Sequence, residues 1–525
     1  MPQLEFIQQS GALGYALLFG PGIVLLLIAL AVKGAVKTTH NFVISGRLLG
    51  FGFGVASLIS VWTWSMAVML SSAQAYTWGT SGLVWFIVPN GLAVIIMVPF
   101  ALKLRQKMPA GYTLAEFIRA RFQNSISSVA TLVFLIGALL GVIMINLAGL
   151  VLVMNKIFGL TPISIVITGI IVVTVYSYFG GLTTSAVTGT LNTLLLGVGS
   201  SVVVLYALAK AGGAGLVFNE VQALGDQHLN PFNPVTAASF GLALALGLLT
   251  NVIADQSFWQ RVWAIRPKDL GRSFLWAGVW FYPIPLALGL LGFIGVAYGV
   301  TPEQLGSLGA GAIGPHVIAS LGLPIFIIAL YTLVVVNACF AAIDGALSGV
   351  TSLVAVDIVH RYWPQVSERK LLTITKTSMI VAAAIAGGVV LTGIDYVNLV
   401  TTVYFYGTSL LIPVTLSIFW SRMTGTGYVA GVVAGIVVGG PLRETLGPTY
   451  GPLFGIIGLI VASAVVSIVV SLRANSRFDF DSLAEGKPVL LEREGARAPK
   501  KVAEEPEKPA AATDDDVLVE PAGQQ

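Results

Sequence analysis

The run PIFIIALYTLVVVNACFAAIDGALSGVTSLVAVD, residues 324–357, decides the fold class of this chain. Between its ends it holds one charged side chain, Asp344, and it is longer than the roughly 20 residues that an α-helix needs to cross a bilayer. It therefore needs tilt, a break near Asp344 and Gly345, or an overhang beyond the membrane. Because a backbone in hydrocarbon must pair its polar groups internally, the run predicts a transmembrane helix.

The rest of the chain repeats this pattern. Of its 525 residues 56% are hydrophobic and 10% are charged, whereas a soluble domain carries about 25% charged residues. The composition excludes an ordinary soluble fold and predicts an all-α polytopic membrane protein with about thirteen transmembrane helices. We expect these helices at roughly 12–33, 48–72, 80–104, 125–155, 160–180, 186–210, 236–256, 272–300, 324–357, 372–393, 397–420, 427–440 and 453–472.

The loops between these helices are asymmetric in charge. With the N-terminus outside, the inner loops hold sixteen Lys and Arg residues, Arg261 among them, and the outer loops hold only Lys156, Lys210 and Arg443. Positive charge marks the cytoplasmic side, so we expect a multi-pass protein of the cytoplasmic membrane with its N-terminus outside and its C-terminus inside. The basic residues are topology signals, so no nucleic-acid partner is implied.

Two further stretches have their own character. Residues 113–122 have apolar side chains at helical spacing with Glu116, Arg119 and Arg121 on other faces, which predicts a short amphipathic helix at the inner surface. Residues 473–525 are rich in Glu, Lys, Pro and Ala and predict a disordered cytoplasmic tail. The single Cys339 and four scattered histidines favour neither a disulfide nor a metal cluster, so we expect no cofactor.

Polar residues inside apolar runs are the candidates for function. Asp344 is either a structural acid, hydrogen-bonded to a nearby Ser or Thr such as Ser348, or the site of a coupling ion or proton. Residues 56–78 interleave hydroxyls with aromatic rings, as in a helix that faces a polar cavity, although an interfacial aromatic belt is the rival interpretation. Residues 249–266 collect polar groups near the end of a Gly-containing helix, where transporters unwind backbone around a solute. The predicted solute-binding residues are Trp62, Thr63, Trp64, Gln74, Asn251, Asp255 and Gln256.

Several motifs give the chain a resemblance to a known family. They are SGRLLG at 45–50, YTLAEFIR at 112–119, FGGL at 179–182, FWQR at 258–261 and DI at 357–358. With these the chain resembles the sodium:solute symporter family, and SVWTW at 60–64 with QSFWQR at 256–261 is most similar to its urea/polyamine branch. The resemblance implies a LeuT-type core of two inverted five-helix repeats. The implied parts are an N-terminal helix and inner loop (1–47), two repeats (48–210 and 211–424), a C-terminal helix pair (425–472) and the tail.

The resemblance also implies a sodium site, from which this sequence departs. Ser60 and Thr63 match positions of the first core helix that donate backbone carbonyls. Ala338, in the run at 324–357, matches a family alanine that is also a backbone-carbonyl ligand. The family's hydroxyl pair falls on Ala341 and Ala342, and the acid of its Thr-Asp pair falls on Gly189. Our hypothesis is that Asp344 takes over ion coupling, as a ligand of Na⁺ or as a carboxyl that exchanges a proton.

These observations predict a secondary symporter for a small polar solute, urea or a similar neutral or cationic compound, coupled to Na⁺ or H⁺. An uncoupled facilitator or channel and a transporter-like sensor are the alternatives. The predicted site lacks an obvious buried Arg or Lys, which disfavours a strongly anionic solute. No HExxH or GxSxG motif suggests an enzyme. The expected partners are the solute and membrane lipid, with the protein a monomer or a loose oligomer.

Overall fold

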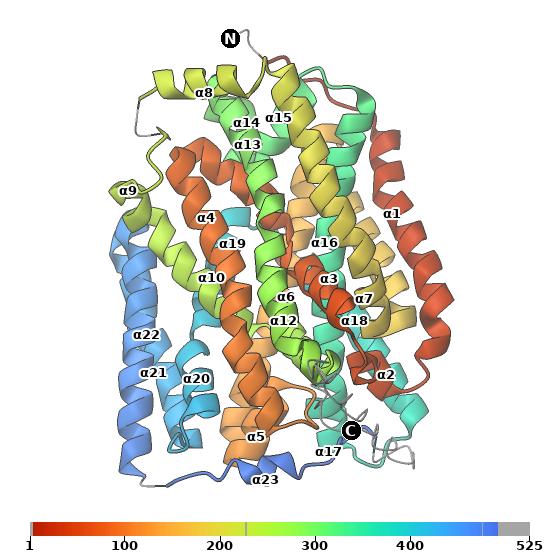
Figure 1. Cartoon of the computed structure of the whole chain (residues 1–525), viewed down its shortest axis with the longest axis vertical. Helices are drawn as coiled ribbons and strands as arrows, with labels where there is room; N and C mark the ends of the chain where they lie inside the picture. Colours follow the sequence, from red (N-terminus) through yellow and green to blue (C-terminus); the bar gives the residue numbers. More distant parts are fainter. Residues whose placement is uncertain (1–3, 226–227, 475, 492–525) are drawn as a thin grey trace, which may run out of the picture.

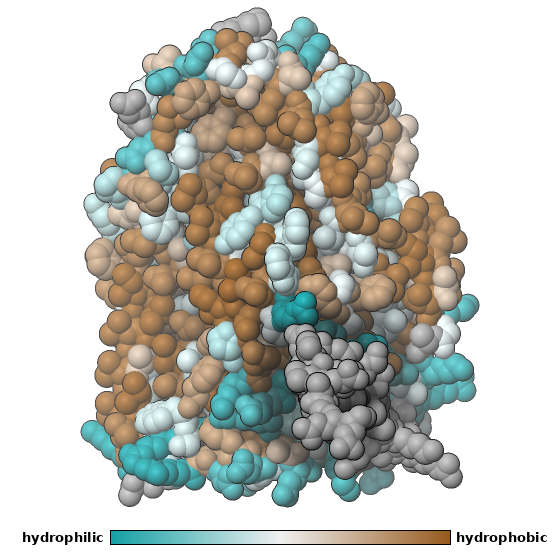
Figure 2. Space-filling view, viewed as in Figure 1, coloured by the Kyte–Doolittle hydropathy of each residue, from teal (hydrophilic) through white to brown (hydrophobic). Residues whose placement is uncertain are grey.

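A computed structural model describes residues 4–225, 228–474 and 476–491, and within them the chain is a bundle of helices with no β-strand beyond one isolated bridge (Figure 1). Eleven of the described helical stretches are long and apolar enough to cross a membrane. Figure 2 shows the matching surface, a broad hydrophobic band with hydrophilic residues gathered towards the two ends of the bundle. The prediction of an all-α polytopic membrane protein is confirmed.

The helices follow one another with short connections. The first half contains α1 (Gly11–Val32), α2 (Thr39–Ile44), α3 (Phe51–Trp62), α4 (Ser65–Lys107), α5 (Leu114–Phe122), α6 (Ser125–Phe158), α7 (Pro162–Lys210), α8 (Ala214–Ala223) and α9 (Pro234–Thr236). The second half contains α10 (Leu242–Ala254), α11 (Gln256–Ala264), α12 (Pro267–Phe281), α13 (Pro283–Ala297), α14 (Pro302–Leu305), α15 (Ile313–Ser320), α16 (Ile325–Leu353), α17 (His360–Tyr362), α18 (Glu368–Val390), α19 (Tyr396–Thr408), α20 (Leu411–Phe419), α21 (Gly425–Thr445), α22 (Gly447–Arg473) and α23 (Asp481–Ala484).

Two of the eleven stretches are interrupted by a glycine. Gly79 in α4 has φ 63° and ψ −145°, and Gly181 in α7 has φ 53° and ψ −146°, which are conformations that only glycine adopts readily. At Gly181 an added Cβ would lie 2.4 Å from the carbonyl oxygen of Phe42, so a side chain is excluded by contact as well. Counting each interrupted stretch as two would give thirteen crossings, a number that stays a prediction.

Residues 324–357 form one long buried helix. α16 continues without a break past Asp344 and Gly345, then passes through a π-helical turn at Val354–Val359 into α17. Of the three expected solutions for its length, a break at Asp344 is therefore wrong. A small residue lets a neighbouring helix approach here: an added Cβ on Gly345 would lie 2.5 Å from Val61, so α3 packs directly on the backbone of α16.

The end of the bundle that carries α2, α5, α17 and α23 is here called the α5 end (Figure 1). α5 itself is largely buried, including Glu116 and Arg121, so it is an internal plug rather than a helix lying on the membrane surface. Residues 476–491 also pack here, and Leu490 is fully buried, which differs from the disorder expected for the whole tail. Residues 492–525 lie outside the described residues.

Candidate functional site

The first core helix is broken between α3 and α4. Thr63 and Trp64 leave the helical conformation, and the Trp64 amide donates to the carbonyl of Trp62 (3.0 Å) instead of reaching four residues back. The next amide, that of Ser65, donates to Oδ1 of Asn146 on α6 (2.8 Å). A neighbouring side chain thus supplies the partner that the interrupted helix lacks. Unwound backbone was predicted for residues 249–266, and the stretch that holds Trp62, Thr63 and Trp64 is unwound as well.

Aromatic rings surround this first break. The Trp62 ring lies 5.6 Å from that of Trp64 and 5.3 Å from that of Phe258 on α11, and Trp64 lies 6.2 Å from Tyr404 on α19. Both indole N–H groups are already used, since Trp62 donates to the carbonyl of Asn90 (2.9 Å) and Trp64 to that of Val61 (2.6 Å). The two tryptophans are almost fully buried and offer ring faces rather than hydrogen-bond donors.

A second break separates α10 from α11 at Asp255. This residue has φ −97° and ψ 107°, and its Oδ1 accepts a hydrogen bond from the amide of Ser257 (2.7 Å). A carboxylate at the N-cap is a favoured way to begin a helix, and here it begins one inside the bundle. The two breaks are joined by the contact between Trp62 and Phe258.

A charged cluster lies beside the second break. Arg261 is fully buried; its Nε donates to Oγ of Ser57 on α3 (2.8 Å), its Nη1 to the carbonyl of Ser257 (2.7 Å) and its Nη2 to Oγ of Ser185 on α7 (3.4 Å). The guanidinium also interacts electrostatically with Asp255 and Asp344. Arg261 was expected in an inner loop, and no obvious buried Arg or Lys was expected at the site. Both expectations are wrong, because α11 continues inside the bundle after its break.

Asp344 belongs to the same cluster. Its carboxylate accepts hydrogen bonds from the hydroxyls of Ser177 and Ser185, both on α7, and only 3% of the residue is exposed. Ser185 therefore touches both the carboxylate and the guanidinium. The sequence predicted a structural partner on α16 itself, at Ser348, whereas the hydroxyls come from α7. Ser177 and Ser185 were missed, because a single serine in an apolar helix carries no signal of its own.

The other predicted ion-site residues lie on the helices around Asp344. Ser60 and Thr63 are buried on α3 and at its end, and the Thr63 hydroxyl donates to the carbonyl of Ile59 (2.8 Å). Ala338, Ala341 and Ala342 are buried on α16. Gly189 on α7 faces α3, since an added Cβ would lie 3.4 Å from Oγ of Ser60. The α7 position without an acid thus lies against one predicted ligand, while α7 hydroxyls bind the acid of α16.

Asn251 carries a free amide one turn before the second break. Its residue is 1% exposed, and neither Oδ1 nor Nδ2 has a hydrogen-bond partner within the described part of the chain. Its neighbour Thr250 shares a hydrogen bond of 2.7 Å with Thr408 on α19. An added Cβ on Gly407 would lie 3.0 Å from Oδ1 of Asn251, so the glycine leaves the amide room. A buried unpaired amide is costly unless something binds it.

Two predicted solute-binding residues lie elsewhere. Gln256 is fully occupied: its Oε1 accepts from the amide of Leu114 (3.1 Å), and its Nε2 donates to the carbonyl of Tyr112 (3.2 Å) and to Oγ of Ser352 (3.1 Å). It ties α11 to the start of α5 instead of facing the aromatic rings. Gln74 is ten residues beyond Trp64 on α4, about 15 Å along the helix, so it is remote from the first break.

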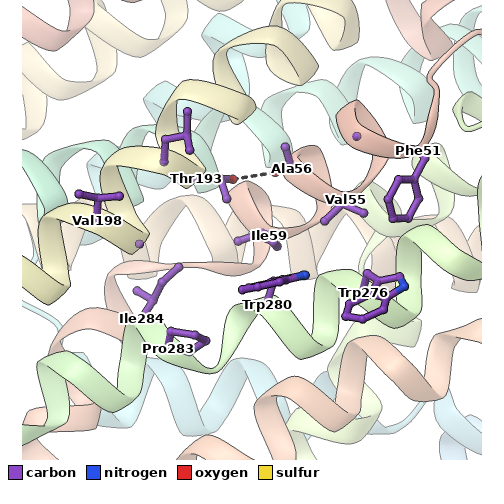
Figure 3. Close-up of a pocket in the computed structure, with 13 residues that line it drawn as sticks. Phe51, Val55, Ala56, Ile59, Thr193, Val198, Trp276, Trp280, Pro283 and Ile284 are labelled. Carbon is purple, nitrogen blue, oxygen red and sulfur yellow. Dashed lines mark hydrogen bonds between the residues drawn. The ribbon is translucent and has the colours of Figure 1, made fainter.

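One apolar cavity of about 480 Å³ lies between α3, α7, α12 and α13 (Figure 3). Trp276, Trp280 and Ile284 lie along one side of it in that view, and Val55 and Ile59 lie on the other. None of the predicted solute or ion residues lines it. Its lining suits a hydrocarbon chain rather than a polar solute.

This arrangement of two broken helices around a buried charged cluster defines a membrane transport protein, and comparison with known proteins agrees. The model of the sodium:solute symporter family matches residues 26–435, so the chain belongs to that family. The chain is 23% identical over 427 residues to "Probable urea active transporter 1" of Schizosaccharomyces pombe, covering 73% of this chain and 61% of that protein. It is also 23% identical over 465 residues to the urea-proton symporter DUR3 of Oryza sativa subsp. japonica, covering 80% and 63%. The chain thus spans about three fifths of the length of these relatives.

Solved structures show the same fold. A Na⁺-coupled sialic acid symporter superposes with a TM-score of 0.75 at 20% identity, over 89% of this chain and 98% of that one. Mhp1, a nucleobase-cation-symport-1 family transporter, superposes with a TM-score of 0.50 at 15% identity, over 86% and 98%. The LeuT-type architecture that the sequence predicted is confirmed.

Proposed function

We propose that this protein is a secondary symporter that carries a small neutral polar solute of the urea or amide class together with one cation, and that Asp344 carries the coupling. The single observation that supports this most is the charge of the buried cluster. With both carboxylates ionised, Asp255 and Asp344 bring two negative charges and Arg261 brings one positive charge. In a medium of low dielectric an unbalanced buried charge is strongly unfavourable.

A coupling cation balances this charge. Na⁺ or H⁺ at Asp344 makes the cluster neutral, and its departure restores the imbalance. The bound and free states therefore differ in stability, which is what allows a gradient to drive a conformational change. The proton is the better candidate, because Ala341 and Ala342 offer no side-chain oxygen to a metal ion, whereas a proton needs only the carboxylate. The name of the rice relative, a urea-proton symporter, agrees with this choice.

The solute class follows from the groups left free beside the breaks. Asn251 presents an unpaired acceptor and an unpaired donor, the pairing that an amide or urea complements. The rings of Trp62, Trp64 and Tyr404 supply flat apolar walls. Arg261 already donates to three hydrogen-bond acceptors, and Asp255 and Asp344 act on it electrostatically, so it does not favour an anionic solute.

For orientation we propose that the α5 end faces the cytoplasm. The basic residues Lys103 and Lys107 at the end of α4 and Arg119 and Arg121 on α5 gather at this end, as positive charge does on the inner side of a cytoplasmic membrane. α1 begins at the opposite end and α22 ends at the α5 end (Figure 1), which gives an outer start and an inner finish.

The test is solute uptake by the purified protein in proteoliposomes, with a pH gradient and a Na⁺ gradient imposed separately. We expect wild-type uptake of radiolabelled urea to follow the pH gradient. Asp344→Asn should lose gradient-driven accumulation while it retains downhill flux, because the amide keeps the shape but not the charge. Asp395→Asn, which changes an exposed helix cap, is the control.

Undiminished accumulation by the Asp344→Asn variant contradicts the role of this acid. Wild-type flux that ignores both gradients favours the facilitator instead. Accumulation driven by the Na⁺ gradient alone keeps the symporter but assigns sodium as the coupling ion.

A further inference from the structure

The part of the C-terminal segment that follows α22 is fastened to the α5 end at two separate places. At the first, Lys107 Nζ lies 2.9 Å from the centre of the Phe480 ring, and the Arg121 guanidinium lies 5.1 Å from Phe478 and 4.5 Å from Phe480. The amide of Phe478 donates to the carbonyl of Ser421 (2.9 Å). Cations within about 6 Å of an aromatic face are attracted to it, and two cations share these two rings.

The cations of this first joint come from different elements. Lys107 ends α4 and donates to the carbonyl of Ile418 on α20 (2.6 Å), while Arg121 on α5 donates to the carbonyl of Trp420 (2.7 Å). The segment therefore binds α4, α5 and the turn after α20 together. α23 lies across the bottom of the bundle in Figure 1, beneath α5.

The second joint is at Leu490, which is fully buried. Its backbone N–H donates to the hydroxyl oxygen of Tyr112, and that oxygen lies 2.8 Å from Nδ1 of His40 on α2. The same Tyr112 accepts Gln256 Nε2 at its carbonyl, and the adjacent Thr113 donates to Oδ2 of Asp357 (2.6 Å). The segment thus contacts the linker formed by residues 112–114, which is hydrogen-bonded to α11 and to the end of α16. These two helices carry Arg261 and Asp344.

From these contacts we infer that residues 476–491 form a strap that holds the α5 end closed, and that the charged cluster reaches water at this end only when the strap loosens. α11 and α16 both lead from the cluster towards the α5 end, and the linker at 112–114 is bonded to Gln256 of α11 and to Asp357 just beyond α16. For water to reach the cluster from this end, the linker must move away from α11 and α16. The strap opposes that motion, because it contacts the linker at Tyr112 and the neighbouring α5 at Arg121.

The test measures opening of the α5 end directly, without solute or an imposed ion gradient, so it stands apart from the proposed function. Cys339 is the single cysteine, and a Cys339→Ala background removes it. Ser348→Cys then places one thiol on α16 at a fully buried position one turn from Asp344 towards the α5 end. A charged methanethiosulfonate reagent is added to membrane vesicles on the α5 side, and its reaction rate with this thiol is measured.

In this background we expect Phe478→Ala with Phe480→Ala to raise the modification rate roughly fivefold or more, because two rings that each face a cation are lost. Arg477→Ala, at an exposed position of the same segment, is the matched control and should leave the rate unchanged. Phe480→Trp keeps an aromatic face at this position, so its modification rate should lie closer to that of the control than to that of the double alanine variant. Equal rates in the double variant and the control overturn the strap.

A second variant covers the case in which the double variant fails to fold. Tyr112→Phe removes only the hydroxyl that Leu490 contacts, so the protein should remain folded, as checked by its melting temperature. We expect it to raise the modification rate about twofold, since the contacts of the hydroxyl with Leu490 and with His40 are lost. A Tyr112→Phe protein that is folded and opens no faster than the control contradicts the proposal as well.

Discussion

Each of the two breaks interrupts a helix inside the bundle, but one break is neutral and the other is charged. The α3–α4 break is neutral, lined by Trp62, Trp64 and Tyr404, and fixed by Asn146 from α6. The α10–α11 break begins at a carboxylate and leads to a buried guanidinium. Under the proposed function this difference is a division of labour. The neutral break would shape the solute site, and the charged break would respond to the coupling ion.

The sharpest way to break this comparison is to remove the charge from the second break. Arg261→Met keeps most of the side-chain volume but leaves Asp255 and Asp344 with no buried cation. Removing one partner of a buried charged group costs about 3–5 kcal/mol, so we expect the variant to lose most of its folded yield. Thermal unfolding in detergent, followed by size-exclusion chromatography, measures this.

Neutralising one acid at the same time should reverse part of that loss. Arg261→Met with Asp344→Asn leaves one unbalanced carboxylate instead of two, so its melting temperature should exceed that of Arg261→Met alone. If the double variant is no more stable than the single variant, the two groups are not coupled.

Two asparagines sharpen the comparison between structure and function. Asn146 uses its Oδ1 for Ser65 and its Nδ2 for Val142 (2.8 Å), whereas Asn251 uses neither group for any described partner. We expect Asn146→Leu to lower stability by about 1–3 kcal/mol, because it leaves the Ser65 amide unpaired. Asn251→Leu should leave stability unchanged or raise it, and should lower urea uptake at least roughly tenfold. Wild-type uptake by Asn251→Leu would remove the amide from the solute site.

A smaller effect is expected at the aromatic wall of the first break. Trp62→Phe removes the hydrogen bond from Nε1 to the carbonyl of Asn90 but keeps an aromatic face towards Phe258. The loss should be about 0.5–1.5 kcal/mol of stability, together with a weaker apparent affinity for solute. If apparent affinity stays unchanged while stability falls, Trp62 has only a packing role.

The fold could be predicted from the sequence because bilayer physics leaves few options. Apolar run length gave nearly all the membrane helices, and the motifs around residues 45–50 and 258–261 indicated the family. The site residues were harder to predict, because hydropathy along the sequence marks the ends of helices. It does not show how far the chain stays inside the bundle after a helix breaks. That is why Arg261 was placed in a loop, and why Gln256, on the same short helix, was assigned to solute although it faces the linker.

The partners of Asp344 show the same limit in another form. A serine in an apolar helix is ordinary, so Ser177 and Ser185 gain meaning only when packing brings α7 against α16. Residues 476–491 were missed for a related reason. Their composition is polar overall, and the few apolar side chains that anchor them, Phe478, Phe480 and Leu490, matter only because Lys107, Arg121 and Tyr112 lie opposite.

The smallest effect expected is on pH dependence, near the linker that Gln256 joins to the charged break. Burial, with the nearby Asp357 carboxylate, raises the pKa of Glu116 to about 7, while burial and the neighbouring Arg47 lower the pKa of His40 to about 4. The Glu116 contribution to stability is present below pH 4.5 and is lost as pH rises towards 7. The His40 contribution is present above pH 6.5 and is lost as pH falls towards 4. Between pH 4.5 and 6.5 the two therefore oppose each other, and the net change in wild-type stability from this pair should be small.

Single variants separate the two contributions, since the melting temperature should gain an upward slope with pH in Glu116→Gln and a downward slope in His40→Gln. Identical slopes in both variants and the wild type would show that neither group titrates in the folded protein as these shifts require.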